Sequence, residues 1–252
     1  LKTVPTKEDF SLDTQAIAAA LTEKTAAIII NSPNNPTGKI YTESDIASLA
    51  KVLSGHREKT GRTVLLIADE PYREIVYDNR KVAPVFPVWA DSVVVTSFAK
   101  NLSLPGERIG YAAVNPDATD AKALVDAIIF TTRVLGYVNA PATFQRIVAA
   151  CWNEPVDYSS YTTRRNKLTA ILRDAGIDYA EPEGAFYLFC KVPEGKNGGN
   201  DGEFCDHLKK YHILGVPGTG FGRKGWFRLA YCVSEKSIER SADAFKKARL
   251  DW

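Results

Sequence analysis

The chain has 252 residues, of which 45% are hydrophobic and 25% are charged, and its formal net charge is +2 at pH 7. That length can bury a large core in one domain or two, while so small a charge and the lack of a long apolar run argue against nucleic acid and membrane partners. The four cysteines are scattered and form no CxxC pair, so we expect no metal site and interpret them as reduced thiols of a cytoplasmic protein.

The first half of the chain alternates predicted helices with short apolar runs. Helices are expected over residues 12–21 and after Thr42, which caps its helix with Asp45 three residues later. Strands are expected over 26–30, 63–68, 92–96 and 109–114, with a surface loop at 78–91. Because the residues of 63–68 are apolar at nearly consecutive positions, the pattern predicts strands covered on both faces and an α/β fold with a mostly parallel sheet.

Polar side chains follow three of these strands, at the point where each strand ends. They are Asn35 after the first strand, Asp69 and Tyr72 after the second, and Ser97, Lys100 and Arg108 after the third. Strands that lie side by side in an open α/β sheet bring their carboxyl ends to one crevice, where ligands bind. We therefore expect these side chains to gather there, with helix capping as the alternative role for Asp69.

Lys100 is a candidate nucleophile. A partly desolvated ammonium group loses its proton more readily, and the free amine can form a Schiff base with a carbonyl compound. Ser97 and Arg108 could hold an anion beside it, since a guanidinium pairs bidentately with phosphate. The alternative, that Lys100 is an ordinary surface lysine, stays open at this point.

The second half of the chain changes to an α+β pattern. Helices are expected over 117–135, 141–152 and 158–175, followed by a strand at 185–190, a glycine-rich loop at 195–202, a helix at 203–211, strands near 213–216 and 226–231, and a last helix at 235–249. The basic residues of 158–175 are interpreted as a solvated helix face. We expect a large domain over 1–140, connecting helices over 141–175 and a small C-terminal domain over 176–252.

Arg228 is a further candidate because it lies among apolar and aromatic residues in the run from Trp226 to Tyr231. An arginine in such surroundings is costly to bury unless it meets an anion, which is either a ligand or a structural partner. The segment just before it, Gly220 to Gly225, matches GxGxxG. It precedes a strand instead of joining a strand to a helix, so we do not interpret it as a dinucleotide-binding motif.

Four motifs together resemble those of the class I/II aminotransferases, which are fold-type I pyridoxal phosphate-dependent enzymes. They are Asn31-Ser-Pro-Asn-Asn35-Pro-Thr-Gly38, Asp69-Glu-Pro-Tyr72, Ser97-Phe-Ala-Lys100 with Arg108 eight residues after the lysine, and Phe227-Arg228-Leu-Ala230. The resemblance implies that fold, pyridoxal 5'-phosphate as the cofactor, an L-amino acid and a 2-oxo acid as substrates, and a homodimer.

The resemblance also implies roles for the residues nearest the cofactor ring. Lys100 is similar to the Schiff-base lysine that moves the proton between the substrate's Cα and the cofactor. Asp69 is similar to the aspartate that keeps the pyridine nitrogen protonated. Asn35 and Tyr72 would hydrogen-bond the phenolic oxygen of the ring.

The remaining matches concern the phosphate and the substrate. Ser97 and Arg108 would hold the phosphate, and Arg228 would bind the substrate's α-carboxylate bidentately. Arg133 lies near the place where members specific for dicarboxylates carry an arginine, although its offset does not match cleanly and a surface arginine is the alternative. Asn139 is expected to line the substrate site.

The chain also departs from the family pattern. Roughly the first third of such enzymes has no counterpart here, and methionine is absent even at residue 1, so the chain resembles the carboxyl-terminal two-thirds of an aminotransferase. We expect such a chain alone to bind the cofactor poorly. Two other functions stay open, namely a carbon–sulfur β-lyase of the same fold and the effector-sensing domain of a transcription regulator.

Overall fold

The computed structural model describes residues 1–195 and 199–252, and these fall into two compact units. The first unit comprises residues 1–33, 40–74 and 81–156, and the second comprises 34–39, 75–80 and 157–252. The predicted domain boundaries at residues 140 and 175 stay a prediction, and residues 196–198 of the predicted glycine-rich loop lie outside the described residues. Each unit is described by itself.

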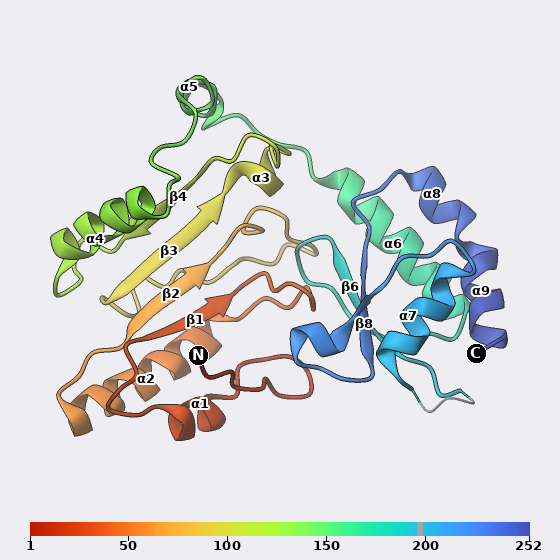
Figure 1. The fold of residues 1–252 in the computed structure, drawn as a ribbon, viewed down its shortest axis with the longest axis horizontal. Coiled ribbons are helices and arrows are strands. Elements are labelled where there is room, and N and C mark those ends of the chain that lie inside the picture. The colour runs from red at the N-terminus through yellow and green to blue at the C-terminus, as the bar shows by residue number, and fades with distance from the viewer. Residues whose placement is uncertain (196–198) are drawn as a thin grey trace. The chain divides into compact units, whose positions relative to one another are not determined.

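A four-stranded sheet forms the centre of the first unit (Figure 1). Its strands are β1 (Ala27–Asn31), β2 (Leu65–Asp69), β3 (Ser92–Ser97) and β4 (Gly110–Val114), in that order across the sheet. The first three strands are parallel, and β4 runs antiparallel to β3. The predicted α/β fold with a mostly parallel sheet is confirmed, so the carboxyl ends of β1, β2 and β3 lie at one edge.

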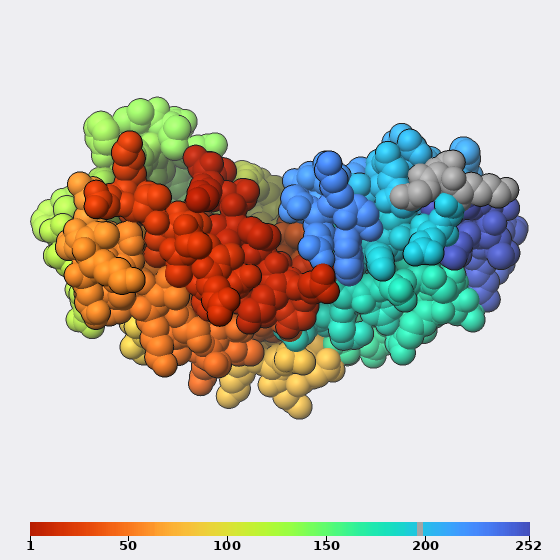
Figure 2. Space-filling view, turned by 90° about the horizontal axis from the view of Figure 1, so that it is seen from below, coloured from red at the N-terminus to blue at the C-terminus, as the bar shows by residue number. Residues whose placement is uncertain are grey.

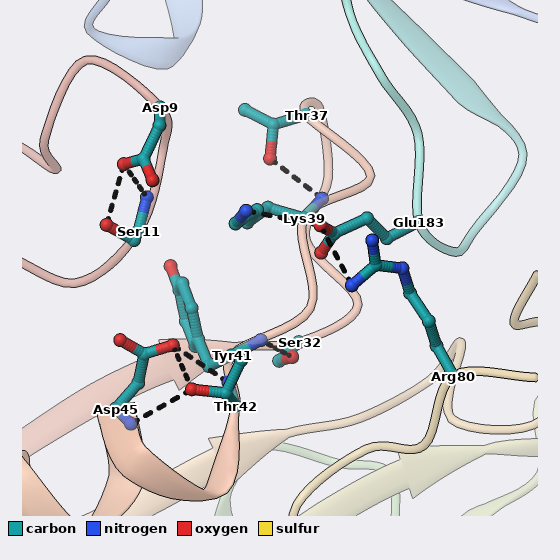
Figure 3. A network of polar contacts seen from close by, with 10 residues as sticks. All are labelled: Asp9, Ser11, Ser32, Thr37, Lys39, Tyr41, Thr42, Asp45, Arg80 and Glu183. Carbon is teal, nitrogen blue, oxygen red and sulfur yellow. Dashed lines mark hydrogen bonds and ion pairs between the residues drawn. The ribbon is translucent and has the colours of Figure 1, made fainter.

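The helices of the first unit are α1 (Thr14–Ala20), α2 (Glu43–Thr60), α3 (Phe98–Asn101), α4 (Ala121–Val134) and α5 (Ala142–Cys151). The predicted capping box begins α2: the Thr42 hydroxyl accepts from the Asp45 N–H at 3.2 Å, and the Asp45 carboxylate accepts from the Thr42 N–H at 2.8 Å (Figure 3). The helix ends at Gly61, whose φ of 70° is left-handed.

The core of the first unit lies between α2 and the sheet. Leu49 and Leu53 of α2 and Leu66 of β2 are fully buried there. Each such side chain contributes about 1.5–3 kcal/mol by leaving water. Unlike α2, helix α4, which is described in full, has no buried residue. Val125, Ile129, Phe130 and Val134 of this helix are exposed. Helix α4 (yellow-green) stands out at the edge of the first unit in Figure 2.

The second unit contains an antiparallel sheet and four α-helices in its described residues. The sheet order is β5 (Tyr179–Ala180), β6 (Tyr187–Lys191), β8 (Trp226–Ala230) and β7 (Val216–Pro217). The helices are α6 (Ser159–Asp174), α7 (Asp201–Lys209), α8 (Glu235–Arg240) and α9 (Ala242–Leu250), and a 3₁₀ turn, η1, spans Gly218–Phe221. This matches the predicted α+β pattern.

Two short segments distant in the sequence belong to the second unit through their own contacts. The Glu183 carboxylate forms ion pairs with Lys39 at 3.2 Å and with Arg80 at 3.3 Å (Figure 3). The hydroxyl of the buried Tyr77 donates to the Ala185 carbonyl at 2.5 Å. These contacts place residues 34–39 and 75–80 against the strands and loops of the C-terminal part.

Two details of the second unit differ from the sequence predictions. The last helix, predicted over 235–249, is divided at Ser241, whose hydroxyl donates to the Ile238 carbonyl at 2.6 Å and competes with helical hydrogen bonding. Arg165, predicted on a solvated face, is 6% exposed. Its guanidinium donates to both carboxylate oxygens of Asp78, at 2.8 and 3.1 Å, and lies 4.5 Å from the centroid of the Tyr77 ring, which explains its burial.

Candidate active site

The ends of β2 and β3 bring the first group of predicted residues together in the first unit. Asp69 is the last residue of β2, Ser97 is the last residue of β3, and the two strands are adjacent and parallel. Lys100 lies three residues past the end of β3, in α3. Its Nζ is 5.8 Å from the centroid of the Tyr72 ring, a weak cation–π distance.

Asp69 carries a half-buried carboxylate that is bound by a neutral amide. The Asn31 side chain donates to this carboxylate at 3.1 Å and to the Asp69 carbonyl at 2.9 Å. Burial raises the pKa of Asp69 above its usual value of 3.8, and the hydrogen bond from Asn31 lowers it in part. Sequence reasoning missed Asn31, although it ends β1 and pairs in register with Asp69.

Ser97 and Arg108 are placed by the hairpin from β3 to β4. The Ser97 hydroxyl accepts from the Ala99 N–H at 3.0 Å and so caps α3. Gly110 pairs with Ser97, and a Cβ at Gly110 would lie 2.4 Å from the Thr96 carbonyl oxygen, so only glycine fits there. This pairing brings Arg108, two residues earlier in the chain, to the same end of β3, where it is exposed.

A cavity of about 970 Å³ opens beside Arg108 within the first unit. Aromatic rings of Phe98, Tyr111 and Trp152 line it, with centroids 5.8 Å apart in each pair. Asn139 also lines the cavity and is exposed. Arg133, near the end of α4, is exposed and is not among the lining residues. The contribution of Phe98, Tyr111 and Trp152 to this cavity was not predicted from the sequence.

Asn35 and Arg228 form a second cluster, in the second unit. Although 193 positions separate them, Arg228 Nη1 donates to Asn35 Oδ1 at 2.9 Å. Arg228 Cζ lies 4.6 Å from the centroid of the Tyr187 ring and 4.9 Å from that of Phe221. Arg228 Nε is buried and has no hydrogen-bond partner among the described residues. Among the described residues, the hydrogen-bond partner of the guanidinium is therefore a neutral amide.

The structure thus groups the predicted residues in two clusters, one in each unit. Asp69, Tyr72, Ser97, Lys100 and Arg108 belong to the first unit. Asn35 and Arg228 belong to the second. In the described part of the chain, no three His, Cys, Asp or Glu side chains gather as metal ligands, and no helix has the length and hydrophobicity needed to cross a bilayer.

Comparison with known proteins gives consistent matches along the chain. The sequence pattern of the aminotransferase class I and II family matches residues 1–245. A probable aspartate aminotransferase from Methanocaldococcus jannaschii is 29% identical, over 98% of this chain and 64% of the relative. An aspartate aminotransferase from Rhizobium meliloti is 32% identical, over 95% of this chain and 60% of the relative.

Solved structures give the same result. A crystal structure of an amino transferase from Eubacterium rectale is 39% identical, with a TM-score of 0.92 over 99% of this chain and 62% of that chain. Aspartate aminotransferase from Thermotoga maritima is 28% identical, with a TM-score of 0.80 over 99% of this chain and 63% of that chain. The chain therefore spans somewhat less than two thirds of the length of these relatives.

Proposed function

The chain belongs to the aminotransferase class I and II family of fold-type I enzymes, and we propose that it acts in a pyridoxal phosphate-dependent transfer of an amino group between an L-amino acid and a 2-oxo acid. The observation that carries this proposal is the placement of Asp69, Lys100 and Tyr72 at the adjoining ends of β2 and β3. When bound, pyridoxal phosphate supplies a carbonyl that reacts with amines and a ring that withdraws electrons.

The first cluster has the chemistry that this cofactor requires. A carboxylate whose pKa is raised by burial, as at Asp69, is stabilised by a nearby cation, and a protonated ring nitrogen is such a cation. The hydroxyl of Ser97 and the guanidinium of Arg108, both at the end of β3, offer donors to a phosphate group. Tyr72 supplies a phenol beside the lysine.

Lys100 performs the proton transfer in this proposal. Lys100 Nζ would hold the cofactor at its carbonyl carbon, and once the substrate's amine has replaced it there, the released neutral amine would accept a proton from the substrate's Cα. A lysine amine accepts a proton only in its neutral form. Lys100 is half-buried, on a helix that Ser97 caps, so its backbone is held in place while its side chain reaches the ring of Tyr72.

The second cluster supports binding of the substrate's carboxylate. Asn35 holds one nitrogen of the Arg228 guanidinium, and two aromatic rings contact the group. The buried Nε–H lacks a protein partner among the described residues, and a buried donor left unpaired costs about 1–3 kcal/mol. A carboxylate would remove that cost and pair with the guanidinium charge.

The proposal extends to the residues that line the substrate site and to association of two copies of the chain. Asn139 lines the cavity beside Arg108, which supports a role near the substrate, whereas Arg133 lies outside that lining. The exposed Ile129 and Phe130 of α4 support association with a second copy of the chain, because large apolar side chains are seldom left in water in such density.

Transaminase assays test the proposal directly. The purified protein, incubated with L-aspartate or L-phenylalanine, 2-oxoglutarate and enough pyridoxal phosphate to offset weak cofactor binding, is expected to form glutamate, and the Lys100→Ala variant is expected to form none. Release of pyruvate from cystathionine without 2-oxoglutarate would instead identify a lyase. Cofactor binding without turnover of any amino acid would contradict the proposed function.

A further inference from the structure

Asp201, at the start of α7, is a buried carboxylate that no step above uses. It is 5% exposed. Asn200 caps α7 with its own side chain, which accepts from the N–H groups of Gly202 and Glu203. The Asp201 side chain is therefore not needed as the helix cap and is directed to another segment.

That segment is the loop of residues 218–225, which Asp201 closes with three hydrogen bonds. Asp201 Oδ2 accepts from the Thr219 N–H at 2.7 Å, and Oδ1 accepts from the Thr219 hydroxyl at 3.0 Å and from the Gly225 N–H at 3.3 Å. The bonds join both ends of the loop to one carboxylate. The glycines of the GxGxxG match lie in this loop, and one of them, Gly225, donates its N–H to Asp201.

The backbone of this loop is closely packed. A Cβ at Gly218 would lie 2.4 Å from the Arg223 carbonyl oxygen and 2.5 Å from that of Trp226. Gly222 and Gly225 have φ of 81° and 74°, which favour glycine. Phe221 lies within this closely packed loop, between the two ends that Asp201 joins.

Phe221 connects the loop to Arg228. Its ring centroid lies 4.9 Å from Arg228 Cζ, and its ring is edge-on to Phe189 at 6.3 Å. A guanidinium that contacts aromatic rings keeps its N–H groups for in-plane partners. On Arg228, Nη1 has Asn35 as such a partner, and the buried Nε–H has none among the described residues.

We propose that Asp201 is a positioning residue for carboxylate recognition: it holds the loop of residues 218–225 so that Phe221 lies over Arg228 and orients the guanidinium toward the substrate's carboxylate. The identity of that carboxylate, from an amino acid or a 2-oxo acid, rests on the proposed function. The path from Asp201 to Arg228 rests only on contacts within the second unit.

The charge of Asp201 is consistent with this role. Burial alone would raise its pKa, but hydrogen bonds donated by the backbone and hydroxyl of Thr219 and by the Gly225 N–H outweigh burial and lower the pKa below its usual 3.8. The carboxylate is thus ionised at neutral pH, and each of its three bonds is charge-assisted.

The test compares Asp201→Asn and Phe221→Leu with a matched control, Asn200→Ala, and with the conservative variant Phe221→Tyr. For each protein, calorimetry gives the dissociation constant of 2-oxoglutarate, steady-state assays give KM and kcat, and urea unfolding reports stability. Asn200→Ala removes the cap of α7 without touching the loop, and Phe221→Tyr keeps an aromatic ring over Arg228.

We expect Asp201→Asn and Phe221→Leu to weaken 2-oxoglutarate binding about three- to thirtyfold, the affinity equivalent of one cation–π contact, and to raise KM with kcat changed less than about twofold. Asn200→Ala is expected to bind as the wild type does, although it unfolds at lower urea, and Phe221→Tyr is expected to recover most of the affinity that Phe221→Leu loses. Wild-type affinity in both test variants, or equal weakening in Asn200→Ala, would overturn the inference.

Failure of the proposed function is visible separately. If the wild type binds 2-oxoglutarate but turns over no amino acid, the transaminase proposal fails, while the binding series still decides the role of Asp201. If the wild type shows no saturable binding of 2-oxoglutarate, the inference is overturned as well.

Discussion

Replacing Arg228 by lysine keeps the positive charge and removes the planar fork, so it isolates the geometry of carboxylate binding. In the structure, Arg228 Nη1 donates a hydrogen bond to Asn35 at 2.9 Å, whereas the buried Nε–H has no hydrogen-bond partner among the described residues. A single ammonium cannot serve both partners in the same plane. Arg228→Lys therefore loses one charge-assisted hydrogen bond and weakens the contacts with the rings of Tyr187 and Phe221.

The magnitude follows from these contacts. A hydrogen bond to a charged group contributes about 1.5–3 kcal/mol, and a cation–π contact about 0.5–2 kcal/mol. A total of about 2–5 kcal/mol corresponds to a loss of about thirtyfold to several thousandfold in kcat/KM. We expect most of the loss in KM, since the carboxylate is bound before and during the chemical step.

The assay is steady-state turnover of the amino acid, with the dissociation constant of 2-oxoglutarate measured in parallel. Arg240→Lys, at an exposed arginine on α8, is the matched control and is expected to behave as the wild type does. If Arg228→Lys retains kcat/KM within about threefold of the wild type, the guanidinium does not bind the carboxylate through its fork, and the reasoning is refuted.

Three further variants test other parts of the structure. Lys100→Ala should abolish turnover in the transaminase assay while the far-ultraviolet circular dichroism stays unchanged, because the half-buried lysine supports no core packing. Asp69→Asn should stabilise the cofactor-free protein against urea at pH 7, because the pKa of Asp69 is raised in the fold; the gain should vanish as the pH falls below about 3.8, where both folded and unfolded carboxyls are protonated. Thr42→Ala should lower the free energy of unfolding of the first unit by about 1 kcal/mol in urea, and Thr42→Ser should restore it, because the hydroxyl accepts from the Asp45 N–H.

Each of these variants has an outcome that contradicts its premise. Residual turnover of Lys100→Ala near the wild-type rate would remove the lysine from the chemistry. A less stable Asp69→Asn at pH 7 would show that the carboxylate gains more from the Asn31 amide than it loses by burial. A Thr42→Ala protein as stable as the wild type would show that water replaces the cap at no cost.

The parallel sheet of the first unit could be predicted because its evidence is local and repeated. Each strand is a short apolar run, and polar residues follow the carboxyl ends of β1, β2 and β3, so the edge that carries Asp69 and Lys100 was readable from the sequence. The register between β1 and β2 could not be predicted from the sequence. This register places Asn31, and no other residue of β1, opposite Asp69.

Contacts between distant segments limited prediction in the second unit. Arg165 sits in a helix rich in basic residues, and nothing near it in the sequence indicates that Asp78, 87 positions away, forms an ion pair with it. The interruption of the last helix at Ser241 depends on a hydroxyl that competes for one carbonyl, and Ser is only moderately unfavourable inside helices.

Asn35 follows a strand of the first unit in the sequence but belongs to the second unit, together with Arg228. Residues 34–39 begin three residues after the end of β1, and the ion pair of Lys39 with Glu183 is one of their contacts in the second unit. Asn35 and Arg228 therefore form a hydrogen-bonded pair within that unit. The lysine and aspartate proposed to serve the cofactor belong to the first unit. In the proposed activity, the residues that would bind the carboxylate and the residue that would transfer the proton therefore belong to different units.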